Sequence, residues 1–231
     1  MNKNDMRVTI LKDGPYLVSG DIPLFYKRIV KKGRIVDLET VKQIETNQNE
    51  SYALCRCGKS KTMPFCDGSH EHAHFDGTET ANRNNYLERA DVLNGPEMDM
   101  YDDGRCAYAR FCHRQHGDVW QETMDSYDAT KKEEAYLGAD LCPAGRLTAS
   151  SKDGNLHEPE LEPKIVIAYD KPLKISAGMW LEGYIPLYSS DGYMYELRNR
   201  YALCRCGESE IKPFCDAIHV NIEFDDKLET K

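Results

Sequence analysis

The sequence has 231 residues, with 30 Lys and Arg against 39 Asp and Glu, a net charge of -9 at pH 7 and 40% hydrophobic residues. This length fits one large domain or two to three small ones. The negative charge argues against a general affinity for nucleic acid or an anionic membrane, because both need a positive surface. No apolar run approaches the roughly 18 residues of a transmembrane helix, and charges interrupt the N-terminus where a signal peptide is apolar. We therefore expect a cytoplasmic protein that binds neither nucleic acid nor membrane.

In chain order, the predicted elements are mostly short strands. Alternating or β-branched residues, separated by glycine-containing turns, are typical of strands. They predict strands at 7–11, 16–19, 164–169, 179–182 and 193–197. Helical periodicity is confined to the middle of the chain, at 106–115 and at 128–140, where Cys142-Pro143 ends the second helix. This order predicts two β-rich modules with a helical module inserted between them.

The nine cysteines fall into three groups of three. Their share of the chain is below that of disulfide scaffolds and their number is odd. In a reducing compartment such clustered cysteines are ligands rather than bridges. The groups are Cys55, Cys57 and Cys66, then Cys106, Cys112 and Cys142, then Cys204, Cys206 and Cys215.

The first and last groups belong to an internal repeat. The heptapeptide YALCRCG begins at Tyr52 and again at Tyr201. The potential ligands Cys55, Cys57, Cys66 and His70 recur 149 positions later as Cys204, Cys206, Cys215 and His219. The likeness extends to LVSGDIPL at 17–24 and WLEGYIPL at 180–187, although the segment that follows is 14 residues longer in the first copy. The repeat predicts two related β modules that differ in the length of one hairpin.

The shared spacing, C-x-C-x8-C-x3-H, is suited to metal binding. Two thiolates at i and i+2 on an extended chain lie on one face, and a Cys and a His four residues apart share a face if that stretch is helical. Two such pairs match two tetrahedral irons bridged by sulfides. Three Cys and one His also satisfy a structural zinc site, so the spacing alone leaves both metals open.

The first copy, CRCGKSKTMPFCDGSH at 55–70, resembles the signature of the CDGSH (NEET) iron–sulfur family. The second copy, CRCGESEIKPFCDAIH at 204–219, keeps the four ligands but has Ala217 and Ile218 where the family has Gly and a small residue. The resemblance implies a 2Fe-2S cluster at each motif. The first two cysteines would hold an inner iron, and the third cysteine and the histidine an outer, more exposed one.

Family members with one motif are homodimers with intertwined strands. The resemblance therefore implies that this chain is a monomer folded as an intramolecular pseudo-dimer. In that arrangement we expect the strands at 16–19 and 179–182 to pack with the opposite copy.

The middle group lies in GRCAYARFC at 104–112 and ADLCPAG at 139–145, which resemble a divergent single-cluster ferredoxin. Bacterial ferredoxins use C-x2-C-x2-C and a distant Cys-Pro, and Ala109 stands where one of these cysteines is missing. The resemblance implies a 3Fe-4S cluster held by Cys106, Cys112 and Cys142. A module without a cluster and another metal arrangement are the alternatives.

The predicted architecture is thus mainly β with short helices. We predict a first CDGSH-type module at 1–85, a divergent α+β ferredoxin-like insert at 86–159, and a second CDGSH-type module at 160–231. The two CDGSH-type modules form the pseudo-dimer.

No nucleophile-and-base constellation, phosphate-binding loop or dinucleotide motif stands out in the sequence, so we expect no enzyme. The leading hypothesis is a protein that carries electrons or iron–sulfur clusters between redox or cluster-acceptor proteins, with an acidic surface suited to a basic patch on the partner. A zinc-binding structural or RNA-binding protein is the alternative. A redox enzyme subunit that serves a separate catalytic chain is a third hypothesis.

Overall fold

A computed structural model describes residues 6–46 and 51–229. Two β-sheets form the centre of the molecule, which confirms the predicted mainly β fold. The first sheet has the order β11-β1-β2-β5 and the second the order β12-β10-β9-β3-β4. The strands of the first sheet are β1 (Arg7–Ile10), β2 (Tyr16–Ser19), β5 (Tyr52–Leu54) and β11 (Leu187–Tyr188). Those of the second are β3 (Leu24–Lys32), β4 (Ile35–Ile44), β9 (Lys164–Asp170), β10 (Ile175–Glu182) and β12 (Arg200–Leu203).

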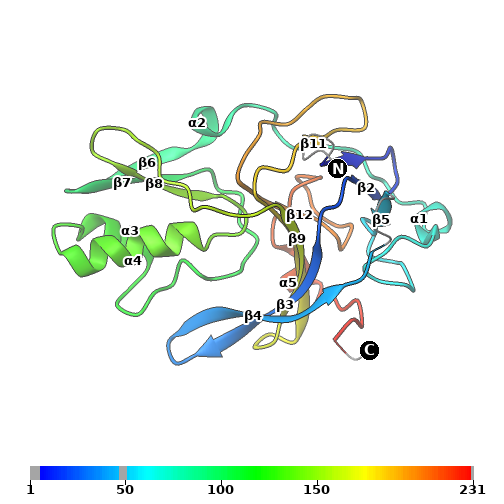
Figure 1. Ribbon diagram of the computed structural model, residues 1–231, viewed down its shortest axis with the longest axis horizontal. Helices are drawn as coiled ribbons and strands as arrows, with labels where there is room; N and C mark the ends of the chain where they lie inside the picture. The colour runs from blue at the N-terminus through cyan, green and yellow to red at the C-terminus, as the bar shows by residue number, and fades with distance from the viewer. Residues whose placement is uncertain (1–5, 47–50, 230–231) are drawn as a thin grey trace.

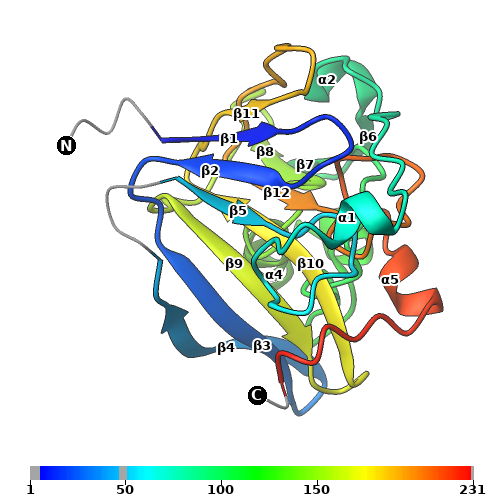
Figure 2. The same ribbon diagram turned by 90° about the vertical axis from the view of Figure 1, so that its right-hand side faces the viewer.

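Each copy of the repeat contributes a strand to the sheet of the other copy. Strand β11 of the second copy pairs in parallel with β1, with Leu187 opposite Val8. Strand β3 of the first copy pairs in parallel with β9, with Leu24 opposite Ile165. The two copies are therefore intertwined as a pseudo-dimer within one chain, and Figure 2 shows their sheets side by side.

The strands expected to cross between copies do so only through their side chains. Strand β2 bonds to β1 and β5, and β10 bonds to β9 and β12, all within their own copies. Tyr16 from β2 and Met179 from β10 nevertheless lie in one buried core. The Tyr16 hydroxyl also donates a hydrogen bond of 2.7 Å to the backbone oxygen of Cys204 in the opposite copy.

The extra length of the first copy forms the β3–β4 hairpin. Gly33, with φ of +62°, lies in its turn, a conformation that glycine adopts without a steric penalty. Strand β4 is the edge of the second sheet and has no buried residue, whereas β3 alternates buried residues such as Leu24 and Tyr26 with partly exposed ones.

The insert forms a separate layer to one side of the two sheets, as Figure 1 shows. The helices α3 (Val119–Met124) and α4 (Ala129–Asp140) lie against a small antiparallel sheet around a core that includes Met98, Met100 and Leu147. Its strands are β6 (Asp91–Asn94), β7 (Met98–Asp102) and β8 (Leu147–Ser151), and α2 (Tyr86–Arg89) precedes them. These elements fall within the predicted range 86–159, and the three domain limits remain a prediction.

Two predicted elements are wrong. The segment 193–197 makes only an isolated bridge between Met194 and Tyr188, because its partner strand β11 has only two residues. The Tyr195 ring packs edge-on against Phe214, with ring centroids 5.3 Å apart. The helix at 106–115 is a loop, in which Tyr108 and Arg110 have φ of +57° and +65°. A right-handed helix does not accept these angles. The other predicted helix is confirmed as α4. Within the described ranges, no helix has the length and apolar character to cross a membrane.

Candidate metal centres

The first motif brings its four predicted ligands together as two pairs. Cys55 and Cys57 follow β5, and their Sγ atoms lie 3.7 Å apart. The Sγ of Cys66 lies 3.4 Å from Nδ1 of His70. The short helix α1 (Ser69–His72) begins only after Cys66. The Asp67 carboxylate turns the chain into this helix, because it accepts hydrogen bonds from the backbone N–H groups of Ser69 and Lys61 at 3.0 and 2.8 Å.

The second motif repeats this geometry. The Sγ atoms of Cys204 and Cys206 lie 3.6 Å apart, and the Sγ of Cys215 lies 3.4 Å from Nδ1 of His219. Ala217, which replaces a glycine of the family signature, adopts φ of +70°, close to the +85° of Gly68 in the first copy. The chain turns into α5 (Ile218–Asn221) in the same way. The substitution therefore adds backbone strain without moving the ligands.

The two ligand loops touch each other. A Cβ atom on Gly58 would lie 2.4 Å from the backbone oxygen of Cys206, and one on Gly207 would lie 2.6 Å from that of Cys57. Both glycines also have positive φ, so these positions require glycine for two reasons. The inner cysteines of both motifs consequently share one buried cluster.

In each inner pair, one cysteine has a lowered pKa and is more readily deprotonated to a thiolate. The hydrogen bond from Cys57 lowers the pKa of Cys55 to about 6, with help from the backbone of Ser60 and Gly58. The hydrogen bond from Cys206 likewise lowers the pKa of Cys204 to about 7. The thiolate is the form that binds metal. Among the residues that the structure describes, no three His, Cys, Asp or Glu side chains converge on one point as ligands of a single ion. Each motif offers two pairs, the donor set that suits a two-iron cluster.

The outer pairs differ in exposure. Cys66 and His70 are half-buried, as expected for an outer pair. Cys215 and His219 are each only 3% exposed, so the expectation of an exposed outer pair is wrong for the second motif. Burial, assisted by the charge of Arg205, lowers the pKa of His219 to about 4. Burial also raises the pKa of Cys215.

The three cysteines of the insert line one cavity, together with Ala109 and Arg146. Burial, together with the charges of Cys142 and Cys106, raises the pKa of Cys112 to about 12. The Arg146 guanidinium is held by the Asp102 carboxylate through hydrogen bonds of 2.6 and 2.7 Å. The cavity thus combines three thiols with a fixed positive charge, and Ala109 contributes no ligating atom to it.

The sequence did not reveal that the cysteine loop of the insert covers the second motif. Ala107, Ala109 and Phe111 pack in one apolar cluster with Cys215. Their alternation is the pattern of an extended chain, and it was the available signal for this contact. The Arg105 guanidinium, in the same loop, lies 4.2 Å from the centroid of the Phe214 ring.

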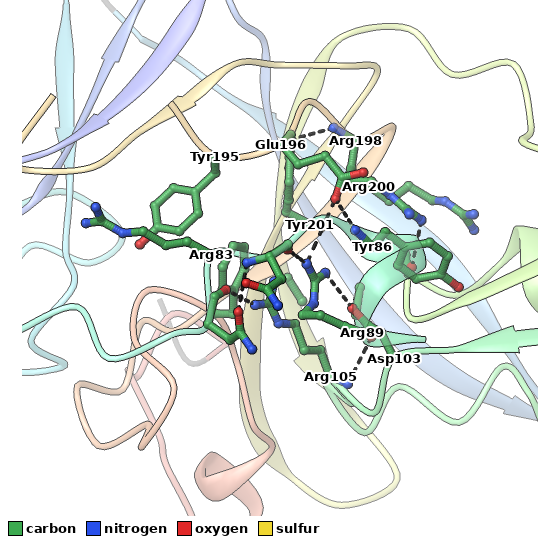
Figure 3. A pocket seen from close by; sticks show the side chains of 16 residues that line it. Arg83, Tyr86, Arg89, Asp103, Arg105, Tyr195, Glu196, Arg198, Arg200 and Tyr201 are labelled. Atoms are coloured by element: carbon green, nitrogen blue, oxygen red, sulfur yellow. Dashed lines mark hydrogen bonds and ion pairs between the residues drawn. The ribbon is translucent and has the colours of Figure 1, made fainter. Parts of the chain in front are cut away.

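An arginine-lined pocket marks the junction between the insert and the second copy (Figure 3). Arg200 of β12 donates hydrogen bonds to the backbone oxygens of Ala139 and Asp140 at the end of α4, at 2.6 and 2.7 Å. The last carbonyls of a helix lack the regular bond to an N–H four residues further on, and Arg200 supplies donors to them. Arg89 bonds to Asp103 at 2.9 Å on the insert side. These contacts fix the insert against the strand that leads into the second motif.

Comparisons with known proteins match the two repeats. A family model described as "Iron-binding zinc finger CDGSH type" matches residues 13–71 and 171–220. The human protein named "CDGSH iron-sulfur domain-containing protein 3, mitochondrial" is 47% identical over 36 residues, which cover 16% of this chain and 28% of the relative. No solved structure matches the chain. Both matches of the family model contain a ligand motif, and the predicted insert at 86–159 lies between them.

Proposed function

Because the chain belongs to the CDGSH family of iron–sulfur proteins and carries the motif in tandem, we propose that it holds two 2Fe-2S clusters and transfers electrons or clusters between partner proteins. Three cysteines and one histidine hold each cluster. The observation that carries this proposal is the paired ligand geometry, which is nearly the same in both motifs. A single zinc ion would instead need all four side chains around one point.

The histidine gives each site its particular chemistry. When bound, a 2Fe-2S cluster takes up and returns one electron. A neutral imidazole donates less negative charge to iron than a thiolate does, so histidine ligation raises the reduction potential. The imidazole can also take up a proton, which weakens its bond to iron and favours release of the cluster.

We further propose that Cys106, Cys112 and Cys142 hold a 3Fe-4S cluster. Three thiols around one cavity, the positive charge of Arg146 and the alanine at position 109 support this assignment. The arrangement supplies one ligand for each of three irons and leaves none for a fourth.

The proposal also covers the oligomeric state, the cellular location and the partners of the chain. We propose that the chain works as a monomer in the cytoplasm, without enzymatic activity of its own, and exchanges electrons or clusters with redox or cluster-acceptor proteins. It would bind neither nucleic acid nor membrane. The intertwined strands support the monomer, since the pairings of β1 with β11 and of β3 with β9 lie within one chain. Light scattering tests the oligomeric state, and cell fractionation tests the location, which for the human relative is named as mitochondrial.

Iron and acid-labile sulfide quantification with EPR spectroscopy tests the cluster assignment. The expected content is that of two 2Fe-2S clusters and one 3Fe-4S cluster per chain. Cys142→Ala should remove the third cluster alone, whereas Cys66→Ala and Cys215→Ala should each remove one 2Fe-2S cluster. A colourless protein that contains zinc would contradict the proposal.

A further inference from the structure

The insert encloses the outer ligands of the second motif. Cys215 packs with Ala107 and Phe111 of the loop that carries Cys106 and Cys112. Arg110 of the same loop forms an ion pair of 2.7 Å with Asp170, at the end of β9. Cys215 therefore lies in the apolar cluster of the cysteine loop, and His219 is buried beside Cys215.

Within residues 6–46 and 51–229 nothing covers the first motif to the same extent, and its inner cysteines adjoin those of the second motif. Cys66 and His70 remain partly exposed, while Cys57 and Cys206 lie in one buried cluster. Figure 1 shows the resulting order along the longest axis of the molecule: the insert helices α3 and α4 at one end, then α5 of the second motif, then α1 of the first motif.

We propose that the three sites form one electron path, in which the insert exchanges electrons with the second motif across the contact between the Cys106–Cys112 loop and Cys215. The path continues to the first motif through the packed inner cysteines and reaches solvent at His70. This inference rests on the proposed clusters. Each transfer moves one electron, so the site that gives it is oxidised by one and the site that receives it is reduced by one. Proteins with one-electron redox centres supply and remove the electron at the two ends.

The chemistry of the contact suits such a path. Electron transfer slows steeply with distance, and the small side chains of Ala107 and Ala109 bring the loop close to Cys215. Ala107, Ala109 and Phe111 line the cavity of the insert cysteines and also belong to the buried cluster of Cys215. Trp180 lies in the same cluster, 6.3 Å from Phe111 between ring centroids. Its buried indole N–H has no hydrogen-bond partner in the described protein, which leaves a donor for a thiolate or sulfide.

EPR power saturation tests the path without an activity assay. A reduced cluster relaxes faster when a second paramagnetic cluster is nearby. The full chain is prepared with Cys66→Ala, which leaves the second 2Fe-2S site, or with Cys215→Ala, which leaves the first, each with and without Cys142→Ala. After reduction with dithionite, Cys142→Ala should lower the half-saturation power of the second site several-fold. It should leave that of the first site nearly unchanged.

The possible results distinguish an electron path through the insert from an insert that only shields the second motif. Three assembled clusters whose second site relaxes independently of the insert would overturn the path but not the proposed function. Iron and sulfide analysis that finds no cluster in the insert would overturn the path and the 3Fe-4S assignment but not the two 2Fe-2S clusters. Arg105→Gln, which removes the stack on Phe214, should produce a smaller decrease. Arg83→Gln is the matched control, because Arg83 lines the same pocket and stacks on Tyr193 at 4.5 Å (Figure 3). Equal effects of these two variants would exclude Arg105 as a positioning residue of the contact.

Discussion

The two CDGSH motifs share ligands and ligand distances but differ in their surroundings. In the first, Cys66 and His70 are partly exposed, whereas in the second, Cys215 and His219 are buried, and Cys215 packs in one cluster with the insert loop. The local sequence of each motif determines the ligand geometry. The cover over Cys215 includes a loop that lies about 100 residues from it in the chain. A duplicated motif can thus provide one exposed site and one protected site in the same molecule.

The buried arginine beside each motif shows a second difference. Arg56 donates hydrogen bonds to the backbone oxygens of Gly14 and Gly77 at 2.8 and 2.9 Å. A Cβ atom on Gly77 would lie 1.9 Å from the guanidinium, so no side chain fits there. The register of the repeat places Asp226 at the equivalent position, and its carboxylate forms a buried ion pair with Arg205. The arginine of the second copy is therefore neutralised by a carboxylate, and that of the first copy is held by neutral carbonyls.

The largest expected effect is on stability, and it follows from this ion pair. Asp226→Ala leaves Arg205 buried without its carboxylate, and breaking such a pair costs about 3–5 kcal/mol. Although burial raises the pKa of Asp226, the Arg205 charge holds it below its usual range, so the carboxylate is ionised at neutral pH. Urea denaturation at pH 7 measures the loss. Asp225→Ala is the matched control, since Asp225 pairs with Lys227 at the surface and its loss should cost much less. Similar losses of unfolding free energy for both variants would show that the buried Arg205–Asp226 pair stabilises the protein no more than an exposed pair does.

The next largest effect is a difference in acid lability. A ligating histidine must be neutral, and burial lowers the pKa of His219 to about 4, against about 6.5 for a free histidine. Between these values the folded protein keeps His219 neutral while the unfolded chain takes up a proton. The contribution of this group to stability is therefore complete above about pH 6.5 and decreases as the pH falls toward 4. Protons therefore begin to compete with iron for the His219 nitrogen only near pH 4.

At pH 5.5 we expect the first cluster to decay roughly tenfold faster than the second, because each pH unit changes a protonated fraction by up to tenfold. Visible absorbance of Cys215→Ala and Cys66→Ala, each combined with Cys142→Ala so that one cluster of the repeat alone remains, measures the two rates. His70→Cys should slow the first, and His219→Cys should have little effect at this pH. Equal decay of the two clusters would show that burial does not protect the second.

Truncation of the cysteine loop that packs on the second motif should reduce the difference in acid lability between the two clusters. Phe111→Ala removes the largest side chain that the cysteine loop packs against the second motif. Water then gains access to Cys215 and His219, so the second cluster should decay several-fold faster in acid while the first is unchanged. Phe111→Leu retains most of the apolar volume and is the matched control. Because truncation of a buried Phe costs about 3–5 kcal/mol, circular dichroism must show that the variant is folded. Unchanged decay in a folded Phe111→Ala protein would assign the protection to another element.

Local patterns allowed much of the fold and site to be predicted. The repeated ligands and the strands at Tyr16–Ser19 and Lys164–Asp170 could be recognised from short stretches of sequence, whereas the pseudo-dimer was implied by the family resemblance of the repeat. Helix α4 was predictable from its composition and its end at Cys142-Pro143. These features depend on neighbours in the chain, so the sequence displays them directly.

The covering loop depended on distant contacts, which sequence patterns do not display. Tyr108 and Arg110 adopt left-handed backbone angles, and neither residue type signals this conformation as glycine does. The alternating Ala107, Ala109 and Phe111 were interpreted as part of a helix because nothing in the sequence indicated the surface that buries them. Tyr195 was assigned to a strand for a similar reason, since its packing against Phe214 exists only in the folded chain.

The smallest expected effect is on reduction potential. Most formal charges in the motifs, including Lys59 and Glu208, are exposed, and salt screens such charges over about 8 Å. The buried groups should therefore dominate. Arg56 places a positive charge near the first cluster without a carboxylate at salt-bridge distance among the described residues. Asp226 cancels the corresponding charge of Arg205, and the apolar cover disfavours the added electron at the second cluster.

Both effects lower the potential of the second cluster, so the first cluster should be reduced first, by roughly tens of millivolts. Redox titration of Cys215→Ala and Cys66→Ala, monitored by EPR, measures the two potentials separately. Asp226→Asn removes a negative charge but keeps the shape of the side chain, so in the Cys66→Ala background it should shift the potential of the second cluster upward, toward that of the first. Asp225→Asn, at an exposed neighbour, should shift it less because solvent screens that charge. A second cluster that has an equal or higher potential than the first would show that burial and the Arg205–Asp226 pair do not control the difference.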